Sequence, residues 1–313
     1  MPIWKEDARL DLDEGTSAFT VQDAERFTRE VTKFINIPEE HIHPAMEDAV
    51  FFIWEESKVP ANIDQYKANL NDPLERQKLA QLLSNGLGNP VGFVIPLEWN
   101  FWTNRWLSCK WEFRNDRLVL IPGNSPIGYR LPLKSLPFIS KSKVQRPIER
   151  SPFDEFDSLE DFYDLAQLRY HAEVPDQELP KEYFQPAYVM DENEGQSKSK
   201  PKRKPKTTEP TPTFEIYTIK TALCIELRHG KIHIFMPPLN YVEHYLDLVA
   251  CVELAAVSAN VKVVIEGYEP PYDNRVTKLS LSPDPGVLEV NIHPAKSWSE
   301  ILHNYDTLFE QAR

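Results

Sequence analysis

The chain of 313 residues is long enough for two ordinary domains, and its 41% apolar and 27% charged residues exclude a wholly disordered or collagen-like protein. The net charge is −13 even though residues 196–206, "QSKSKPKRKPK", carry six lysines and arginines, so the remainder is acidic and we expect no nucleic-acid binding. No apolar stretch reaches the ~18 residues of a membrane span, no secretory signal opens the chain, and the three cysteines form no CxxC pair, so we expect a soluble, cytoplasmic protein without structural disulfides or zinc.

Residues 1–187 are predicted to form an N-terminal module of helices followed by an antiparallel meander. Apolar residues at helical spacing predict helices over 20–35 and 45–57, and Asp72 followed by Pro73 predicts the start of a third. The pattern then changes to short strands separated by Asn, Gly and Pro turns. These strands are "VGFVIPLEW", "CKWEF", "RLVLIPG" and "YRLPLKSL". A further helix is predicted over 158–171, with Ser158 and Asp161 at its start.

Residues 188–213 lack apolar periodicity and are rich in Pro, Lys, Ser, Thr and Glu, which is typical of a disordered linker. A nuclear-targeting role is the alternative for its basic run. The composition favours a solvated tether between two modules.

Residues 214–313 are predicted to form a C-terminal module with the element order β-β-α-β-β-β-α. The strands would form a mixed sheet with both helices on one face, so the whole chain belongs to the α+β class. "TALCIEL" and "KIHIFM" predict one hairpin, and "KLSLS" and "VLEVNIH" predict another across a Pro285-Gly286 turn. Ser297 and Glu300 predict a capping box for the last helix, whose apolar face we expect to be buried.

A candidate metal site lies on the strand 287–293. Because side chains alternate across a sheet, Glu289, Asn291 and His293 share one face of this strand, about 7 Å apart. Glu and His are suitable ligands for a divalent cation, and Asn supplies a further oxygen. Glu266, at the end of the preceding strand, would add a second carboxylate if the two strands lie close together. The alternative is an ordinary solvent-facing side of a sheet.

A candidate anion site lies in the loop "IPGNSPIGYRLPLKSLPF", residues 121–138. Its glycines and prolines can present backbone N–H groups to an anion, with Ser125 as a hydroxyl donor and Arg130 as a bidentate fork. The alternative is a rigid connection whose arginine pairs with a carboxylate. Aromatic residues at 99–113 could stack a ligand, although such clusters more often belong to a core. Cys224 falls within a predicted strand and Cys251 within a predicted helix, without cationic neighbours in the sequence, which favours inert thiols.

Several longer strings of the sequence are distinctive when taken together. They are "FFIWEESKVPANID", "NDPLERQKLA", "GLGNPVGFVIPL", "LIPGNSPIGYRLPLKSLPF", "KTALCIE", "VVIEGYEPP" and "SPDPGVLEVNIHPAKSWSE". These strings, which cover roughly residues 37–138 and 220–313, resemble a bacterial domain family described as an amidoligase. That family is grouped with the glutamine-synthetase-like carboxylate–amine ligases and commonly follows a transglutaminase-like domain.

The resemblance implies a glutamine-synthetase-like fold and an ATP- and Mg²⁺-dependent reaction on an amino acid or peptide. Glu266, Glu289, Asn291 and His293 would then hold the metal, and Arg130 with Ser125 would bind phosphate or the substrate carboxylate. No transglutaminase-like segment precedes residue 1, so no Cys-His-Asp triad is expected. Family members continue past the position of residue 313 with a Gly-rich, His-containing segment. We therefore expect an incomplete module that a second chain completes.

Two other functions are compatible with the sequence. One is a non-catalytic scaffold or partner-binding fragment of a transglutaminase/amidoligase-type assembly. The other is a peptide- or glycan-binding module that uses the tryptophans of residues 99–111.

Overall fold

The computed structural model describes residues 18–58, 82, 86–101, 103–113, 116–137, 156, 158–175, 177, 218–292 and 294–311. The chain divides into two compact units, residues 1–154 with 161–270 and residues 155–160 with 271–313. The predicted linker 188–213 and nearly all of the predicted helix after Asp72 lie outside the described residues.

The first unit contains four α-helices, short 3₁₀ turns and eight strands among the described residues. In chain order these are α1 (Val21–Ile35), η2 (Glu39–His41), β1 (His43–Met46), α2 (Ala49–Glu56), β2 (Gly92–Pro96), β3 (Glu98–Asn100), β4 (Arg105–Leu107), β5 (Leu118–Val119), η3 (Ile127–Tyr129), η4 (Leu133–Ser135), α4 (Phe162–Tyr170), β6 (Ala222–Arg228), β7 (Lys231–Met236), α5 (Val242–Ala259) and β8 (Val263–Gly267). The second unit contains β9 (Ser280–Asp284), β10 (Val287–Asn291) and α6 (Trp298–Gln311).

A six-stranded mixed sheet with the order β5-β1-β2-β6-β7-β8 organises the first unit. β2 pairs antiparallel with β6, so the sheet joins strands from both sides of the predicted linker. The predicted boundary between residues 1–187 and 214–313 is therefore not a boundary in this sheet. The predicted meander is also corrected, because β5 pairs parallel with β1, β3 and β4 form a separate hairpin, and residues 127–135 form 3₁₀ turns where a strand was expected.

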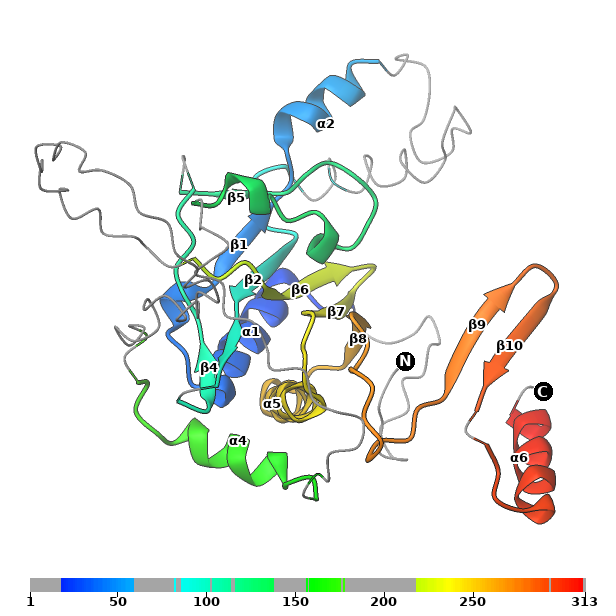
Figure 1. Cartoon of the computed structure of the whole chain (residues 1–313). Coiled ribbons are helices and arrows are strands. Elements are labelled where there is room, and N and C mark those ends of the chain that lie inside the picture. Colours follow the sequence, from blue (N-terminus) through cyan, green and yellow to red (C-terminus); the bar gives the residue numbers. More distant parts are fainter. Residues whose placement is uncertain are drawn as a thin grey trace, which may run out of the picture. The chain divides into compact units, whose positions relative to one another are not determined.

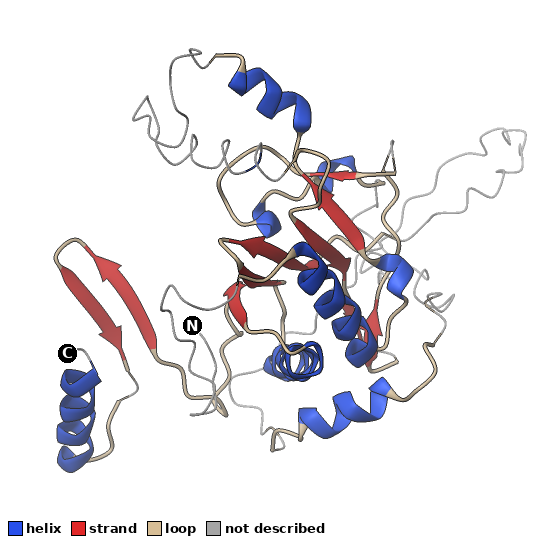
Figure 2. Ribbon diagram, turned by 180° about the vertical axis from the view of Figure 1, so that it is seen from behind, coloured by secondary structure: helices blue, strands red, loops and turns tan. Residues whose placement is uncertain are grey.

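Strict alternation of side chains gives the sheet two apolar faces. One face packs against α1 and α5, and α4 packs on these two helices; Figures 1 and 2 show all three helices on the same side of the sheet. It carries Phe93, Ile95, Leu223, Ile225, Ile232, Ile234 and Met236. The opposite face packs against the segment that contains β5, η3 and η4. It carries Ala45, Val94, Ala222, Cys224 and Phe235. Residues 120–136, which follow the edge strand β5, therefore cover this face of the sheet.

Local sequence signals set several element boundaries. Thr20 caps α1, because its backbone N–H donates to Asp23 Oδ2 at 2.9 Å and its hydroxyl accepts from the Asp23 N–H at 3.3 Å. The predicted hairpin of β6 and β7 is confirmed, with a two-residue turn at His229-Gly230. α4 begins after Asp161, whose carboxylate accepts from the N–H groups of Tyr163 and Asp164, so this helix starts later than predicted.

The second unit is a hairpin followed by a helix. β9 and β10 pair antiparallel across Pro285-Gly286, and Gly286 has the positive φ of 81° that a type II turn requires. Half of the predicted capping box is observed, since the Glu300 N–H donates to Ser297 Oγ at 3.2 Å, whereas the Glu300 carboxylate accepts from the Lys296 N–H at 2.7 Å. The expected burial of the apolar face of α6 is not observed, because four of its large apolar side chains are exposed. They are Trp298, Leu302, Tyr305 and Phe309.

The α+β class is thus confirmed by helices that pack on mixed sheets. None of the helices in the described part of the chain combines the length and apolar character needed to cross a membrane.

Candidate functional site

Four polar side chains from β6, β7 and β8 gather on the sheet face that is opposite to the helices. Glu226 and Arg228 continue the face of Cys224, and His233 lies directly across from Glu226 in the antiparallel pair. Glu266 lies across from Phe235, which belongs to the same face. We call Glu226, Arg228, His233 and Glu266 the sheet cluster.

Arg228 is the centre of the sheet cluster. Its Nη2 donates to Glu266 Oε2 at 2.6 Å and lies 2.8 Å from His233 Nδ1, and its Nη1 donates to Glu226 Oε2 at 3.3 Å. His233 Nδ1 also lies 3.4 Å from Glu266 Oε2, so the imidazole contacts both the guanidinium and the carboxylate. One cation is therefore shared by two carboxylates.

Glu266 is incompletely bonded within this cluster. Its Oε1 is buried and has no hydrogen-bond donor among the residues that the structure describes, whereas Oε2 accepts from Arg228. Burial by itself would raise the pKa of the Glu266 carboxyl, but the contacts with His233 and Arg228 outweigh it and hold the pKa below its usual value. Glu266 is thus an anion whose Oε1 can accept a further hydrogen bond.

The predicted anion loop lies against this cluster. The backbone N–H of Ile127 donates to Glu226 Oε2 at 3.2 Å. Gly128 allows a close approach, because a Cβ atom at this position would lie 2.2 Å from the Phe235 ring. Tyr129 and Tyr268 both contact Phe235, at ring-centroid distances of 4.7 and 6.0 Å. The structure therefore brings the loop and the Glu266 strand together.

Within this loop, the two predicted ligand-binding residues have different positions. Ser125 is exposed, two residues before Ile127. Arg130 is buried, its Nη1 and Nη2 donate to the two oxygens of Glu47, and its Nε donates to the Ile121 carbonyl at 2.7 Å. The guanidinium of Arg130 is thus fully engaged in a bidentate pair, as the structural alternative for this loop anticipated.

The predicted metal ligands are distributed over two units. Glu266 belongs to the six-stranded sheet, and Glu289 and Asn291 belong to the two-stranded sheet of the second unit. Asn291 Nδ2 donates to Glu289 Oε1 at 2.9 Å, so these two residues share a face as predicted. His293 lies outside the described residues. Within the described ranges, no three His, Cys, Asp or Glu side chains are grouped so that they could hold a metal ion.

Alternation also points to the residues that the sequence analysis missed. Glu226 and Arg228 follow Cys224 at every second position, and His233 alternates with the core residues of its strand. The same reasoning that was applied to 287–293 identifies them. The two tyrosines have no such signal, because Tyr129 lies in a 3₁₀ turn and Tyr268 follows the end of β8.

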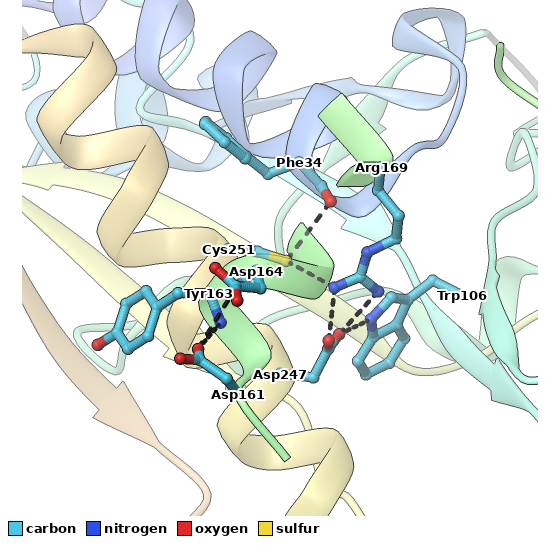
Figure 3. A network of polar contacts seen from close by, with 8 residues as sticks. All are labelled: Phe34, Trp106, Asp161, Tyr163, Asp164, Arg169, Asp247 and Cys251. Carbon is cyan, nitrogen blue, oxygen red and sulfur yellow. Dashed lines mark hydrogen bonds and ion pairs between the residues drawn. The ribbon is translucent and has the colours of Figure 1, made fainter. Parts of the chain in front are cut away.

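A second polar network joins α4, α5 and β4 in the helical layer, and we call it the Asp247 network (Figure 3). Asp247 Oδ2 accepts from Trp106 Nε1 at 2.6 Å and from Arg169 Nη1 at 3.0 Å, and its Oδ1 accepts from Arg169 Nη2 at 2.5 Å. Asp247 is only 3% exposed. Both carboxylate oxygens are therefore engaged, and the network fixes α4 and the β3–β4 hairpin to α5.

The cysteines and tryptophans have structural positions. Burial raises the pKa of the Cys224 and Cys251 thiols far above the ordinary value and that of Cys109 to about 11, so none is poised as a thiolate. Trp106 and Trp111 are buried, which favours the core alternative for these aromatics. Trp102 lies outside the described residues.

Comparison with known proteins identifies a family for this chain. No curated protein and no solved structure matches it. A family model matches residues 1–313, its full length, under the description "Putative amidoligase enzyme (DUF2126)". The chain with this sheet cluster belongs to that amidoligase family.

Proposed function

We propose that this chain carries out, or takes part in, the ATP-dependent joining of a carboxylate to an amine, with an amino acid or peptide as one substrate. Membership in the amidoligase family supports the reaction class. The observation that supports the location is the sheet cluster, in which two carboxylates, a guanidinium and an imidazole gather on one sheet face beside a glycine-containing loop.

The chemical problem is that a carboxylate and an ammonium do not condense in water, because the leaving group is poor and both ions are solvated. ATP would supply the phosphoryl group that turns one carboxylate oxygen into a leaving group. Arg228 is the cation of this cluster and its side chain is 28% exposed, so it is suited to hold a carboxylate or phosphate oxygen. Exposed Ser125 can add a hydroxyl donor. Bringing both substrates to one place can contribute several kcal/mol.

Mg²⁺ would enter with the phosphates of ATP, since this ion is usually held by one or two carboxylates together with substrate phosphates. The described residues do not fit a resident metal site, because no suitable group of three ligands is present among them and Arg228 lies between the two carboxylates of the sheet cluster. We therefore assign no step of the reaction to Mg²⁺. Glu266, Glu289, Asn291 and His293 remain a sequence-based prediction for its ligands.

We further propose that the second unit is completed by another polypeptide segment. Trp298, Leu302, Tyr305 and Phe309 of α6 are 48–72% exposed, and a two-stranded hairpin alone is marginally stable in water. An exposed apolar stripe of this kind is typical of an interaction surface. The same observation favours the second candidate function, a non-catalytic scaffold that binds its partner through α6.

The test measures phosphate release from ATP by the full chain with Mg²⁺ and a mixture of amino acids. The assay is run with and without the protein that the adjacent reading frame encodes, which is the proposed second polypeptide. We expect release in the presence of that product, and a loss of at least 10-fold in an Arg228→Ala variant. The control is Glu253→Gln, a carboxylate on α5 that accepts from the Tyr163 hydroxyl. Tight association without any phosphate release would support the scaffold and contradict the ligase.

A further inference from the structure

Two exposed tyrosines lie beside Phe235, which is the neighbour of Glu266 across the strand pair. The Tyr129 and Tyr268 rings are 61% and 46% exposed, and their centroids are 6.4 Å apart. Both rings contact Phe235, the residue directly across from Glu266 in the pair of β7 and β8. An aromatic surface therefore lies on the same side of the sheet as the Glu266 carboxylate.

The Glu266 carboxylate is suited to accept a hydrogen bond from a ligand. Its Oε1 lacks a donor among the described residues, and a buried polar atom without a partner is energetically unfavourable. Its Oε2 depends on Arg228, which also donates to Glu226. The negative charge of Glu266 is thus only partly compensated by the guanidinium, and its Oε1 has no donor among the described residues.

These two features call for a cation that carries N–H groups. Aromatic faces attract cations, and an ammonium beside a carboxylate forms a charge-assisted hydrogen bond. A primary ammonium brings one positive charge and three donors. A divalent metal ion would bring two positive charges next to the guanidinium of Arg228, which lies 2.6 Å from Glu266 Oε2. The geometry therefore favours a monovalent ammonium.

We infer that Glu266, Tyr129 and Tyr268 form the binding site for the amine substrate, a primary ammonium on an alkyl chain. This chemistry is shared by free alkylamines and by the side chain of lysine, both of which are protonated at neutral pH. The inference rests on the proposed ligase function and assigns its amine side to the tyrosine edge of the sheet cluster.

The experiment measures binding to the full chain by calorimetry or ligand-observed NMR in the absence of ATP. The probes are n-butylamine, Nα-acetyl-lysine N-methylamide, n-butanol and MgCl₂. We expect the two amines to bind at least 10-fold more tightly than butanol, with Glu266→Gln weakening both by at least 10-fold and Tyr268→Ala weakening both about 3–10-fold. Preference for one amine over the other distinguishes a free alkylamine from a lysine side chain as the substrate.

Two controls separate binding from folding. Circular dichroism checks that each variant is folded, and Glu253→Gln should leave amine binding unchanged. Unaltered amine binding in folded Glu266→Gln, equal binding of butanol, or displacement of the amine by Mg²⁺ would overturn the inference.

The outcomes also separate this inference from the proposed function. Amine binding that depends on Glu266 without any ATP turnover would support the amine site and contradict the ligase function. Turnover that is insensitive to Glu266→Gln would leave the ligase standing and remove the inference.

Discussion

Two carboxylates of the first unit, Asp247 and Glu266, each bind an arginine but differ in how completely they are bonded. Both oxygens of Asp247 accept hydrogen bonds, from Trp106 and Arg169, in a nearly dry interior. Glu266 uses one oxygen, its other oxygen has no donor in the described part of the chain, and its strand neighbour Phe235 contacts two exposed tyrosines. The difference suggests that the Asp247 network serves stability, whereas the sheet cluster retains bonding capacity for a ligand.

The largest effect is expected at the buried network. Asp247→Ala leaves the Arg169 guanidinium and the Trp106 N–H without their acceptor, which should lower the free energy of unfolding by about 3–5 kcal/mol. Urea unfolding measures this change, and Asp164→Asn, an exposed position on α4, is the control. A loss below 1 kcal/mol would remove the stabilising role of the network.

A smaller loss is expected at Arg130, which resembles the Asp247 network because it is buried and fully bonded. Arg130→Lys keeps the charge but loses the bidentate fork to Glu47, and should cost about 1.5–3 kcal/mol. Urea unfolding together with phosphate binding is the measurement. If Arg130→Lys binds phosphate more weakly at unchanged stability, Arg130 is a ligand-binding residue, as the sequence analysis predicted.

The buried His43 should make the free energy of unfolding depend on pH. His43 Nε2 accepts from the backbone N–H of Trp111 at 2.9 Å, and burial lowers the pKa of His43 to about 4. Because the folded-state pKa lies below the usual value of about 6.5, this contribution to stability is present above pH 6.5 and is lost as the pH falls toward 4. We expect a loss of about 1–2 kcal/mol over that range, allowing for residual solvent access.

The measurement for His43 is the free energy of unfolding between pH 7 and pH 4. His43→Gln retains an acceptor for Trp111 and does not titrate, so the difference in slope between the two proteins isolates the histidine. Equal slopes would contradict the shifted pKa.

The smallest effect on stability is expected at Glu266. Glu266→Gln should change the free energy of unfolding by less than about 1 kcal/mol in the absence of ligand, because one oxygen has no donor and the side chain is partly exposed. Thermal unfolding of Glu266→Gln and of Asp247→Asn, measured under the same conditions, compares the two carboxylates directly. Equal losses in the two variants would mean that the clusters do not differ in kind.

Secondary structure was largely predictable from the sequence. The order from β6 to α6, the Thr20 and Ser297 helix starts and the Pro285-Gly286 turn depend on neighbouring residues, and the sequence patterns identify most of them. The pairing of β2 with β6 and of β1 with β5 was not predicted, because local patterns do not specify which distant strands become neighbours.

The candidate site was predicted only in part. Glu266 and the loop at 121–130 were identified, and they lie on the same side of the sheet. Arg130 has the right residue type for an anion, but its pairing with Glu47 depends on tertiary contacts. Arg228 and His233 were missed although their alternation was visible, and the placement of Tyr129 and Tyr268 depends on the packing around Phe235.

The pairing of β2 with β6 has a consequence for synthesis on the ribosome. About 125 residues separate the end of β2 from the start of β6, and at roughly 5–20 residues per second this corresponds to a delay of about 6–25 s. During that interval the nascent chain exposes an apolar strand edge whose natural neighbour has not yet emerged. Chaperone capture or a translational pause between these strands should therefore govern the yield of active protein more strongly than the intrinsic speed of helix formation.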